Sequence, residues 1–145
     1  MKGSKNSAIL FLFAGILLIL QSAISGLVFD DGIGALAAGG FAFVMFIEMG
    51  MAYKGGLSAV MDQTVFDTPG WRTVTTRDTG QRIQATPCCG ACIGIATIAV
   101  TALFSAGLGE AILFLAPGFL AGVIAILASI VFAVEYKGPW TERAF

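Results

Sequence analysis

Histidine is absent from the chain, and charged residues make up only 12% of its 145 residues. Without histidine, the chain lacks the usual general base, the commonest side-chain metal ligand and the usual axial ligand of haem. A soluble domain carries about 25% charged residues. The net charge of −1 provides no basic field for nucleic acid. The composition therefore argues against a soluble domain and against nucleic-acid binding.

Motifs for catalysis and cofactor binding are also missing. The sequence shows no nucleophile–base pair, no phosphate-binding loop and no dinucleotide-binding motif. We therefore expect neither enzymatic activity nor a cofactor.

Cysteine is confined to one short run, Cys88, Cys89 and Cys92. Such a run is not the framework of a disulfide-stabilised secreted domain. The thiolates are weak candidates for a metal site because tetrahedral zinc needs four ligands, which only two chains together would supply. Acylation beside a membrane is the other alternative. We expect unmodified cysteines.

Apolar residues, in contrast, make up 57% of the chain. A helix needs about 20 apolar residues to cross the roughly 30 Å hydrocarbon core of a bilayer. Four runs meet that requirement: residues 8–29, 33–53, 91–108 and 111–134. Pro117 interrupts the fourth run and is expected to kink that helix near one end. The sequence therefore predicts an all-α membrane protein with four transmembrane helices.

The spacing of the spans predicts two tandem helical hairpins. The first hairpin occupies residues 1–55 and the second residues 91–138. A polar loop, residues 56–90, joins them, and residues 139–145 form a tail.

The basic residues predict how the hairpins are oriented. All eight Lys and Arg residues lie near the chain ends or in the middle loop, whereas the two tight turns carry Asp30, Asp31 and Glu110. Because cytoplasmic segments are enriched in Lys and Arg, both termini and the middle loop are predicted to be cytoplasmic.

A cleaved signal peptide is the alternative for the first span. Lys2 and Lys5 precede an apolar run, residues 9–20, and the small residues at 23–25 resemble a cleavage site. Because the apolar stretch continues through Phe29, we expect the span to be retained.

The two hairpins resemble each other in sequence. A shift of 83 residues aligns residues 8–55 with 91–138 without a gap, and 12 of 48 positions are identical. Each hairpin closes with Tyr-Lys-Gly. Duplication explains this match, and the shared composition of membrane helices is the alternative explanation.

The aligned positions retain small residues four apart, a spacing that lets helix backbones approach closely in lipid. We expect Gly39 and Gly122 to occupy equivalent contacts in the two hairpins. The candidate packing residues are Ser22, Gly26, Gly39, Ser105, Gly109, Gly118 and Gly122.

Glu48 is the one carboxylate well inside a span, and an intramembrane acid is by default a proton or cation site. It precedes Tyr53 by five residues, about 7.5 Å of helix rise. From that depth its side chain is expected to reach the headgroups, Lys54 or an arginine of the loop.

Hydroxyl groups recur along one face of the third span, at Thr97, Thr101 and Ser105. Gln21 and Ser25 form a shorter polar stripe on the first span. Facing each other, the two stripes would line a narrow ion path that includes Glu48. The alternative, which we favour, is that these groups bond backbone carbonyls or neighbouring helices.

The middle loop holds the best candidate for a partner-binding surface. Asp-Thr-Gly at 78–80 separates two runs rich in β-branched residues, a pattern that predicts a short β-hairpin within residues 71–86. A lone hairpin is marginally stable in water, so it needs the membrane face, the C-terminal segment or another chain. The candidate surface residues are Trp71, Arg72, Arg77, Arg82 and Trp140.

Three functions remain open. The leading interpretation is a small membrane subunit with an assembly role, in contact with lipids and with copies of itself or other membrane chains. A small channel or ion-coupled transporter using Glu48 and the Thr97, Thr101 and Ser105 stripe is the alternative. A structural protein of a viral or cellular membrane shell is the third.

The predicted topology is testable by cysteine labelling from the two sides of the membrane. Cysteines placed at Asp31 and Gly109 should react only from outside, because the turns lack positive charge. Cysteines at Thr75 and Glu142 should react only from the cytoplasm. Reversed labelling at either turn would contradict the four-span topology.

Overall fold

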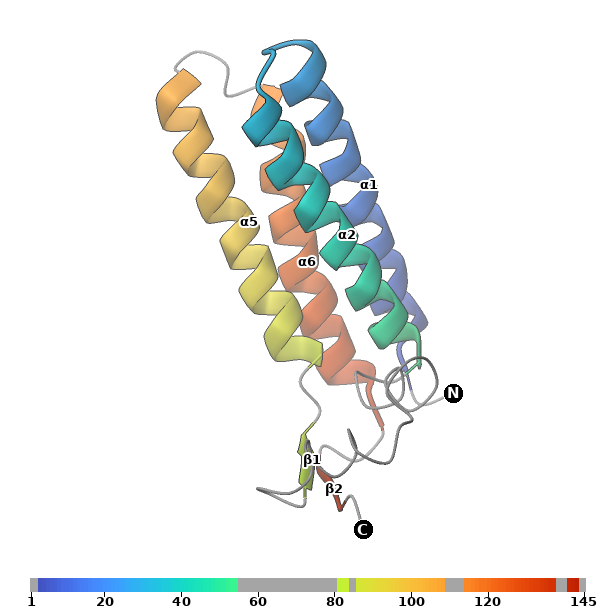
Figure 1. Cartoon of the computed structure of the whole chain (residues 1–145). Helices are drawn as coiled ribbons and strands as arrows, with labels where there is room; N and C mark the ends of the chain where they lie inside the picture. Colours follow the sequence, from blue (N-terminus) through green and yellow to red (C-terminus); the bar gives the residue numbers. More distant parts are fainter. Residues whose placement is uncertain (1–2, 55–80, 84–85, 109–113, 138–140, 144–145) are drawn as a thin grey trace, which may run out of the picture.

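The computed structural model describes residues 3–54, 81–83, 86–108, 114–137 and 141–143, and its main feature is a bundle of four long helices (Figure 1). The helices are α1 (Lys5–Leu27), α2 (Gly32–Lys54), α5 (Thr86–Leu108) and α6 (Ala116–Glu135). All four are long and apolar enough to cross a membrane. The predicted multi-pass, four-helix membrane protein is therefore confirmed at this level.

Two helix starts differ from the predicted spans. Helix α5 begins at Thr86 and includes the whole cysteine run, because Pro87 is tolerated in a first helical turn. Helix α6 begins only at Ala116. The expected kink at Pro117 is wrong, because a proline in the first turn removes no intrahelical hydrogen bond.

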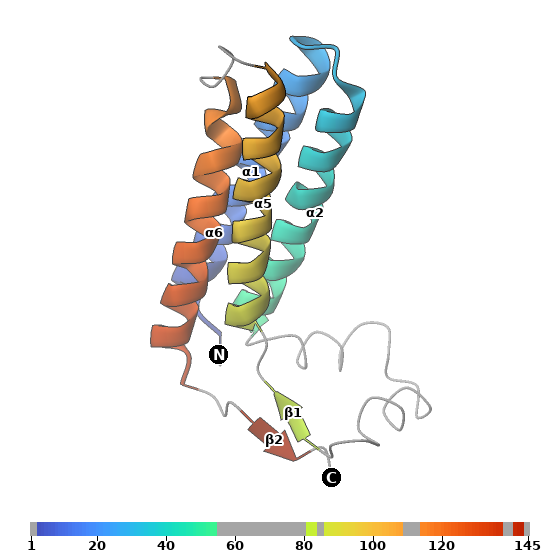
Figure 2. The same cartoon turned by 90° about the vertical axis from the view of Figure 1, so that its left-hand side faces the viewer.

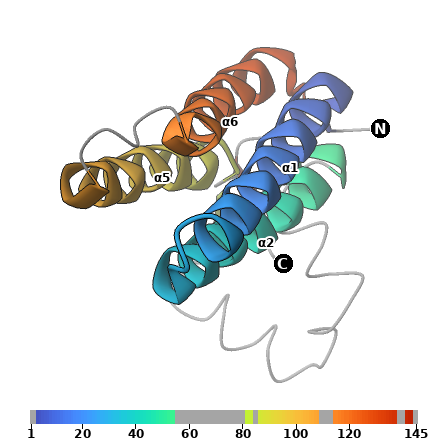
Figure 3. The ribbon, with the colours of Figure 1, turned by 90° about the horizontal axis from the view of Figure 1, so that it is seen from above.

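Helices α1 and α6 form the centre of the bundle. Helix α1 packs along both α2 and α6, and α5 packs mainly on α6, whereas α2 and α5 touch only sparsely (Figures 2 and 3). The largest fully buried apolar side chains, Phe11, Leu18, Met45 and Phe132, come from the α1, α2 and α6 faces. The line along which α2 approaches α5, here called the α2–α5 seam, is the least filled part of the bundle.

Two aspartates build the turn between α1 and α2. Asp30 adopts a left-handed backbone conformation with φ 51°, which aspartate tolerates better than most residues. Asp31 precedes α2, and its Oδ1 accepts a hydrogen bond of 3.0 Å from the Gly34 N–H. The first turn of α2 is thereby capped at the membrane boundary.

The opposite end of the bundle is held by the segment before α1. The Ser4 N–H donates to the Ala52 carbonyl oxygen at the end of α2, at 2.9 Å. The Ser4 hydroxyl donates to the Glu135 carboxylate at the end of α6, and the Asn6 amide donates to the same group at 2.7 Å. This segment therefore joins the ends of α1, α2 and α6.

A two-stranded sheet lies beyond the same end of the bundle, where both chain ends are also found (Figure 1). Strand β1 (Gln81–Ile83) pairs antiparallel with β2 (Thr141–Arg143), and Arg82 lies opposite Glu142. The hairpin predicted within residues 71–86 falls largely outside the described residues, as do Trp71, Arg72, Arg77 and Trp140. The described part of that region pairs with the C-terminal segment.

The closest approach of two helix backbones is between α5 and α6. A Cβ atom on Gly122 would lie 2.8 Å from the Gly94 carbonyl oxygen, and a Cβ on Gly94 would lie 2.8 Å from the Gly122 carbonyl oxygen. Real Cβ atoms do not approach other atoms so closely, so both positions require glycine.

The contacts of Gly39 and Gly122 are not equivalent. A Cβ on Gly39 would lie 3.6 Å from the Ser22 Oγ, an ordinary contact distance. The expected equivalence is wrong because α5 meets α6 in another register: Gly118 faces Thr101, whereas Ser22, the counterpart of Ser105, bonds the Ala35 carbonyl oxygen. The duplication itself stays a prediction.

The other packing candidates divide by helix. A Cβ atom added at Gly26 would lie 3.5 Å from the Ala35 Cβ, so Gly26 lies at the α1–α2 contact. Ser105 bonds the Ala102 carbonyl of its own helix, and Gly109 lies outside the described residues. Close contacts at Gly15, Gly90 and Gly94 were not predicted, because Gly15 and Gly94 align with large residues of the other hairpin and Gly90 lies outside the aligned range.

Alanine substitution tests this difference between the glycines. We expect Gly122→Ala to destabilise the bundle by about 1–3 kcal/mol, because the new methyl group overpacks the α5–α6 contact. Gly39→Ala should cost little, and Gly40→Ala is the control, because its Cβ would have no atom within 4 Å. Thermal unfolding in detergent measures the effect. Equal melting temperatures for Gly122→Ala and Gly39→Ala would contradict the assigned contact.

Candidate functional site

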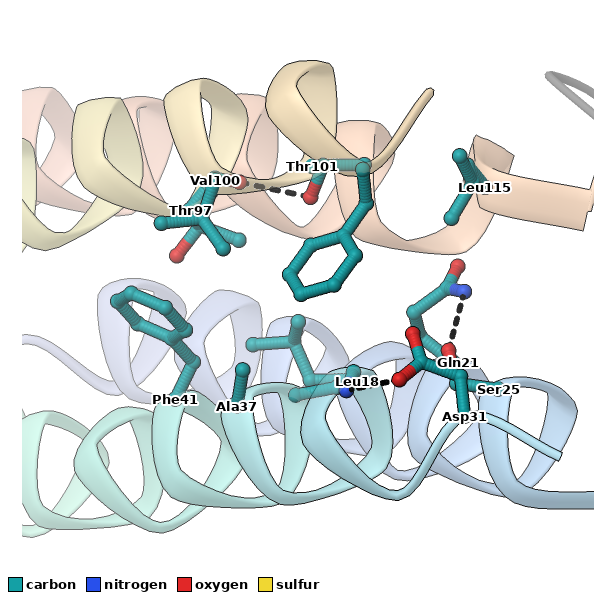
Figure 4. Close-up of a pocket in the computed structure, with 13 residues that line it drawn as sticks. Leu18, Gln21, Ser25, Asp31, Ala37, Phe41, Thr97, Val100, Thr101 and Leu115 are labelled. Atoms are coloured by element: carbon teal, nitrogen blue, oxygen red, sulfur yellow. Dashed lines mark hydrogen bonds between the residues drawn. The ribbon is translucent and has the colours of Figure 1, made fainter. Parts of the chain in front are cut away.

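A small cavity with an apolar wall and a few polar groups lies along the α2–α5 seam, toward the end of the bundle that holds the Asp30–Asp31 turn (Figure 4). Its volume is about 30 Å³, enough for very few water molecules. Apolar side chains of α1, α2 and α5, and Leu115 before α6, form most of the wall. The polar lining residues are Gln21, Ser25, Asp31, Thr97 and Thr101.

Gln21 is the central polar residue of this cavity, and its amide connects two helices. Its Oε1 accepts a hydrogen bond of 3.3 Å from the Gly118 N–H, and its Nε2 donates to the Ser25 Oγ at 3.4 Å. Leu115, at the N-cap of α6, has no side chain able to cap that helix. The Gly118 N–H in the first turn of α6 therefore finds its hydrogen-bond acceptor on α1. Such N–H groups at a helix start have no partner within their own helix, and lipid supplies none.

The threonines of the cavity are bonded within α5. The Thr97 hydroxyl donates to the Ile93 carbonyl oxygen at 2.8 Å. The Thr101 hydroxyl donates to the Thr97 carbonyl oxygen at 2.7 Å (Figure 4). Their protons are thus committed to the helix backbone. The hydroxyl oxygens can only accept further bonds from a molecule in the cavity.

The residues of the predicted ion path are only partly brought together. Gln21, Thr97 and Thr101 line the same cavity, together with Ser25. Ser105 does not line it, nor does Glu48. In the part of the chain that the structure describes, the predicted path therefore consists of separate pieces.

Asp31 is the lining residue that the sequence did not assign to this site. Its position directly before a span marks it as a helix cap, and that role is observed. That the same side chain borders a cavity depends on how α5 packs against α2. No spacing within one helix encodes that arrangement.

Glu48 lies deeper in the bundle than expected. Its side chain is only 2% exposed, and its Oε2 has no hydrogen-bond partner among the described residues. It follows Met45 by three positions and precedes Ala52 by four, so it shares the inward face of α2 with both. The expected reach to the headgroups is therefore wrong, because this face turns toward the other helices.

The cysteines are divided between two faces of α5. Cys88 and Cys92 are exposed, whereas Cys89 is half-buried and lies within electrostatic range of Glu48. Within the described ranges, no group of three or more His, Cys, Asp or Glu side chains is arranged to hold a metal ion. The metal and acylation alternatives gain no geometric support here.

Comparison of the chain with protein-family models, with curated proteins and with solved structures finds no significant match.

Removal of the Gln21 amide tests its bridging role. We expect Gln21→Leu to lower the stability of the bundle by about 1 kcal/mol, because the Gly118 N–H loses its acceptor in an apolar setting. Ser105→Ala is the control, since the Ser105 hydroxyl bonds only its own helix. Steric trapping or thermal unfolding in detergent gives the difference. A Gln21→Leu protein as stable as the control would show that the bridge is not needed.

Proposed function

We propose that the protein is a small multi-pass membrane subunit with an assembly role, and that the outer face of α5 is its contact surface for a second copy or another membrane chain. The main observation behind this proposal is that α5 exposes mostly small side chains on its outer face. Helix α5 is also the least enclosed helix, with 22% of its span buried in the bundle compared with 39% for α1 and for α6.

The outer face of α5 consists mainly of small residues. Exposed positions recur at intervals of three and four and so form one stripe along the helix. The stripe, here called the α5 face, consists of five small residues and two large ones: Cys88, Cys92, Ile95, Ala99, Ala102, Leu103 and Ala106.

The outward faces of the other helices are larger. Helix α1 exposes Phe13, Ile16 and Ile19, and α6 exposes Leu120 and Leu127. Bulky apolar side chains of this kind suit contact with lipid chains. Small residues allow another helix backbone to approach, and this close packing is what drives helix association in lipid. The α5 face therefore suits a protein partner better than it suits lipid.

The orientation in the membrane is part of the proposal. The Asp30–Asp31 turn, the C-terminal end of α5 and the N-terminal end of α6 lie at one end of the bundle (Figure 1). Both chain ends lie at the other, as do the basic residues of the described part, Lys5, Lys54, Arg82, Lys137 and Arg143 (Figure 1). We assign that second end to the cytoplasm because of the positive charges. An assembly role at these surfaces requires no catalytic group.

Ion-coupled transport is the second candidate function, and one observation favours it: Glu48 is buried without a partner for its Oε2. The separation of Glu48 from the cavity lined by Gln21 and Thr101 is the reason why we place transport second.

Disulfide cross-linking through the native cysteines tests the assembly role. In membranes, proteins that retain only Cys88 or only Cys92 should form covalent dimers on mild oxidation, because both lie on the α5 face. A cysteine-free protein carrying Ile130→Cys is the matched control: Ile130 is exposed on α6 near the same end of the bundle. Ala99→Leu should reduce cross-linking by blocking close approach.

The result separates the two kinds of partner. Dimers from Cys88 or Cys92 but not from the control support self-assembly through α5. Adducts of the same cysteines with another membrane chain support a mixed complex. If neither forms, and native mass spectrometry shows only monomers, the assembly role is wrong.

A further inference from the structure

Glu48 is the buried acidic side chain that the packing of the bundle leaves unexplained. Other buried polar side chains bond groups of the bundle: the Ser7 hydroxyl donates to the Ala128 carbonyl oxygen, and the Ser129 hydroxyl donates to the Ala125 carbonyl oxygen. The Glu48 Oε2 has none among the described residues, although the side chain is 98% enclosed. An ionised carboxylate in that position would be strongly disfavoured.

Among the side chains that the structure describes, no charged group of the neighbouring helices neutralises Glu48, whereas the Lys54 side chain and the loop arginines Arg72 and Arg77 lie outside the described part. From α1, Lys5 is exposed and lies in an outer groove with Met49 and Tyr53. From α5, the nearest titratable group is the Cys89 thiol. From α6, Glu135 is negative itself and is engaged by Ser4 and Asn6.

We propose that Glu48 is a proton-binding site inside the bundle, and that its carboxyl group carries one proton in the packed form described above. In the binding step, the carboxylate takes one proton from water and becomes a neutral acid. Release returns the proton to water, and no other bond is formed or broken. This inference does not depend on the assembly role.

The small number of ligand groups near Glu48 favours a proton over a metal cation as the bound species. A bound Ca²⁺ or Mg²⁺ needs about six oxygen ligands, and transition metals need several nitrogen or sulfur ligands. In the described part of the chain, no three acidic, cysteine or histidine side chains gather around one point. A proton needs a single oxygen, and Glu48 offers it.

The position of Glu48 gives the proton a short route to water. Only five residues, about 7.5 Å of helix rise, separate it from Tyr53 at the end of α2. The Cys89 thiol of α5 lies within electrostatic range of Glu48, and the α2–α5 seam is the most loosely packed contact between neighbouring helices. Proton exchange therefore requires only that this seam loosen near its end.

A hydrophobic carbodiimide distinguishes a neutral buried acid from an ionised one. The acid proton passes to a carbodiimide nitrogen while a carboxyl oxygen bonds the central carbon, and rearrangement leaves a stable N-acylurea on the residue. With the full-length protein in liposomes, mass spectrometry should find this adduct on Glu48 at about pH 5. The yield should fall at higher pH, because ionisation consumes the neutral acid that burial favours.

Two controls make the labelling specific. Asp30, exposed at the α1–α2 turn, should instead react with a water-soluble carbodiimide and an added amine, under conditions that leave Glu48 untouched. Glu48→Gln should give no adduct at that position. Infrared spectra should show a neutral carboxyl band in the wild type that is absent from this variant.

The stability of Glu48→Gln provides an independent test. Glutamine has nearly the shape of the neutral acid, so the variant should melt at the same temperature as the wild type. A large loss of stability would mean that an ionised, paired carboxylate holds the bundle together, and the proposal would be overturned. Absence of the adduct at every pH, or equal reaction of Glu48 and Asp30 with the water-soluble reagent, would also overturn it.

Discussion

A membrane interior supplies no water to hydrogen-bond a backbone N–H or C=O group, and this constraint shapes the whole bundle. Helices satisfy most of these groups internally, so the need is greatest at the helix ends. Ser4 and Asp31 cap the helices that follow them, and Gln21 reaches from α1 to the start of α6. The hydroxyls of Thr97 and Thr101 return to carbonyls of their own helix. Polar side chains thus act mainly as internal partners for the backbone.

Small residues then decide how closely the helices approach. Gly94 and Gly122 bring α5 and α6 into backbone contact, and the Ser22 hydroxyl bonds across from α1 to α2. No comparable contact joins α2 to α5, which leaves the seam and its small cavity between them. Two features are not accounted for by packing alone: the carboxyl group of Glu48 and the small outward side chains of α5. Our two proposals address these two features.

The sequence predicted the features that depend on composition within one segment. Four apolar runs predicted the four helices, because crossing a bilayer fixes both length and hydrophobicity. What it could not predict depends on how helices rotate and slide against one another. Glu48 was expected near water because its depth is visible in the sequence, whereas the inward direction of its face is not. Similarly, Pro117 appears mid-run in the sequence, and only the late start of α6 makes it a first-turn residue.

The pairing of β1 with β2 has a consequence for the order in which the protein matures. Strand β1 emerges from the ribosome before α5 and α6, and its partner strand is synthesised only after both helices. The two strands lie on the same side of a membrane only if α5 and α6 cross it as a pair, since a single crossing between them would separate the strands. A chain in which α6 failed to insert would leave β1 without a partner. The strand pair thus links the membrane crossings of α5 and α6 to each other.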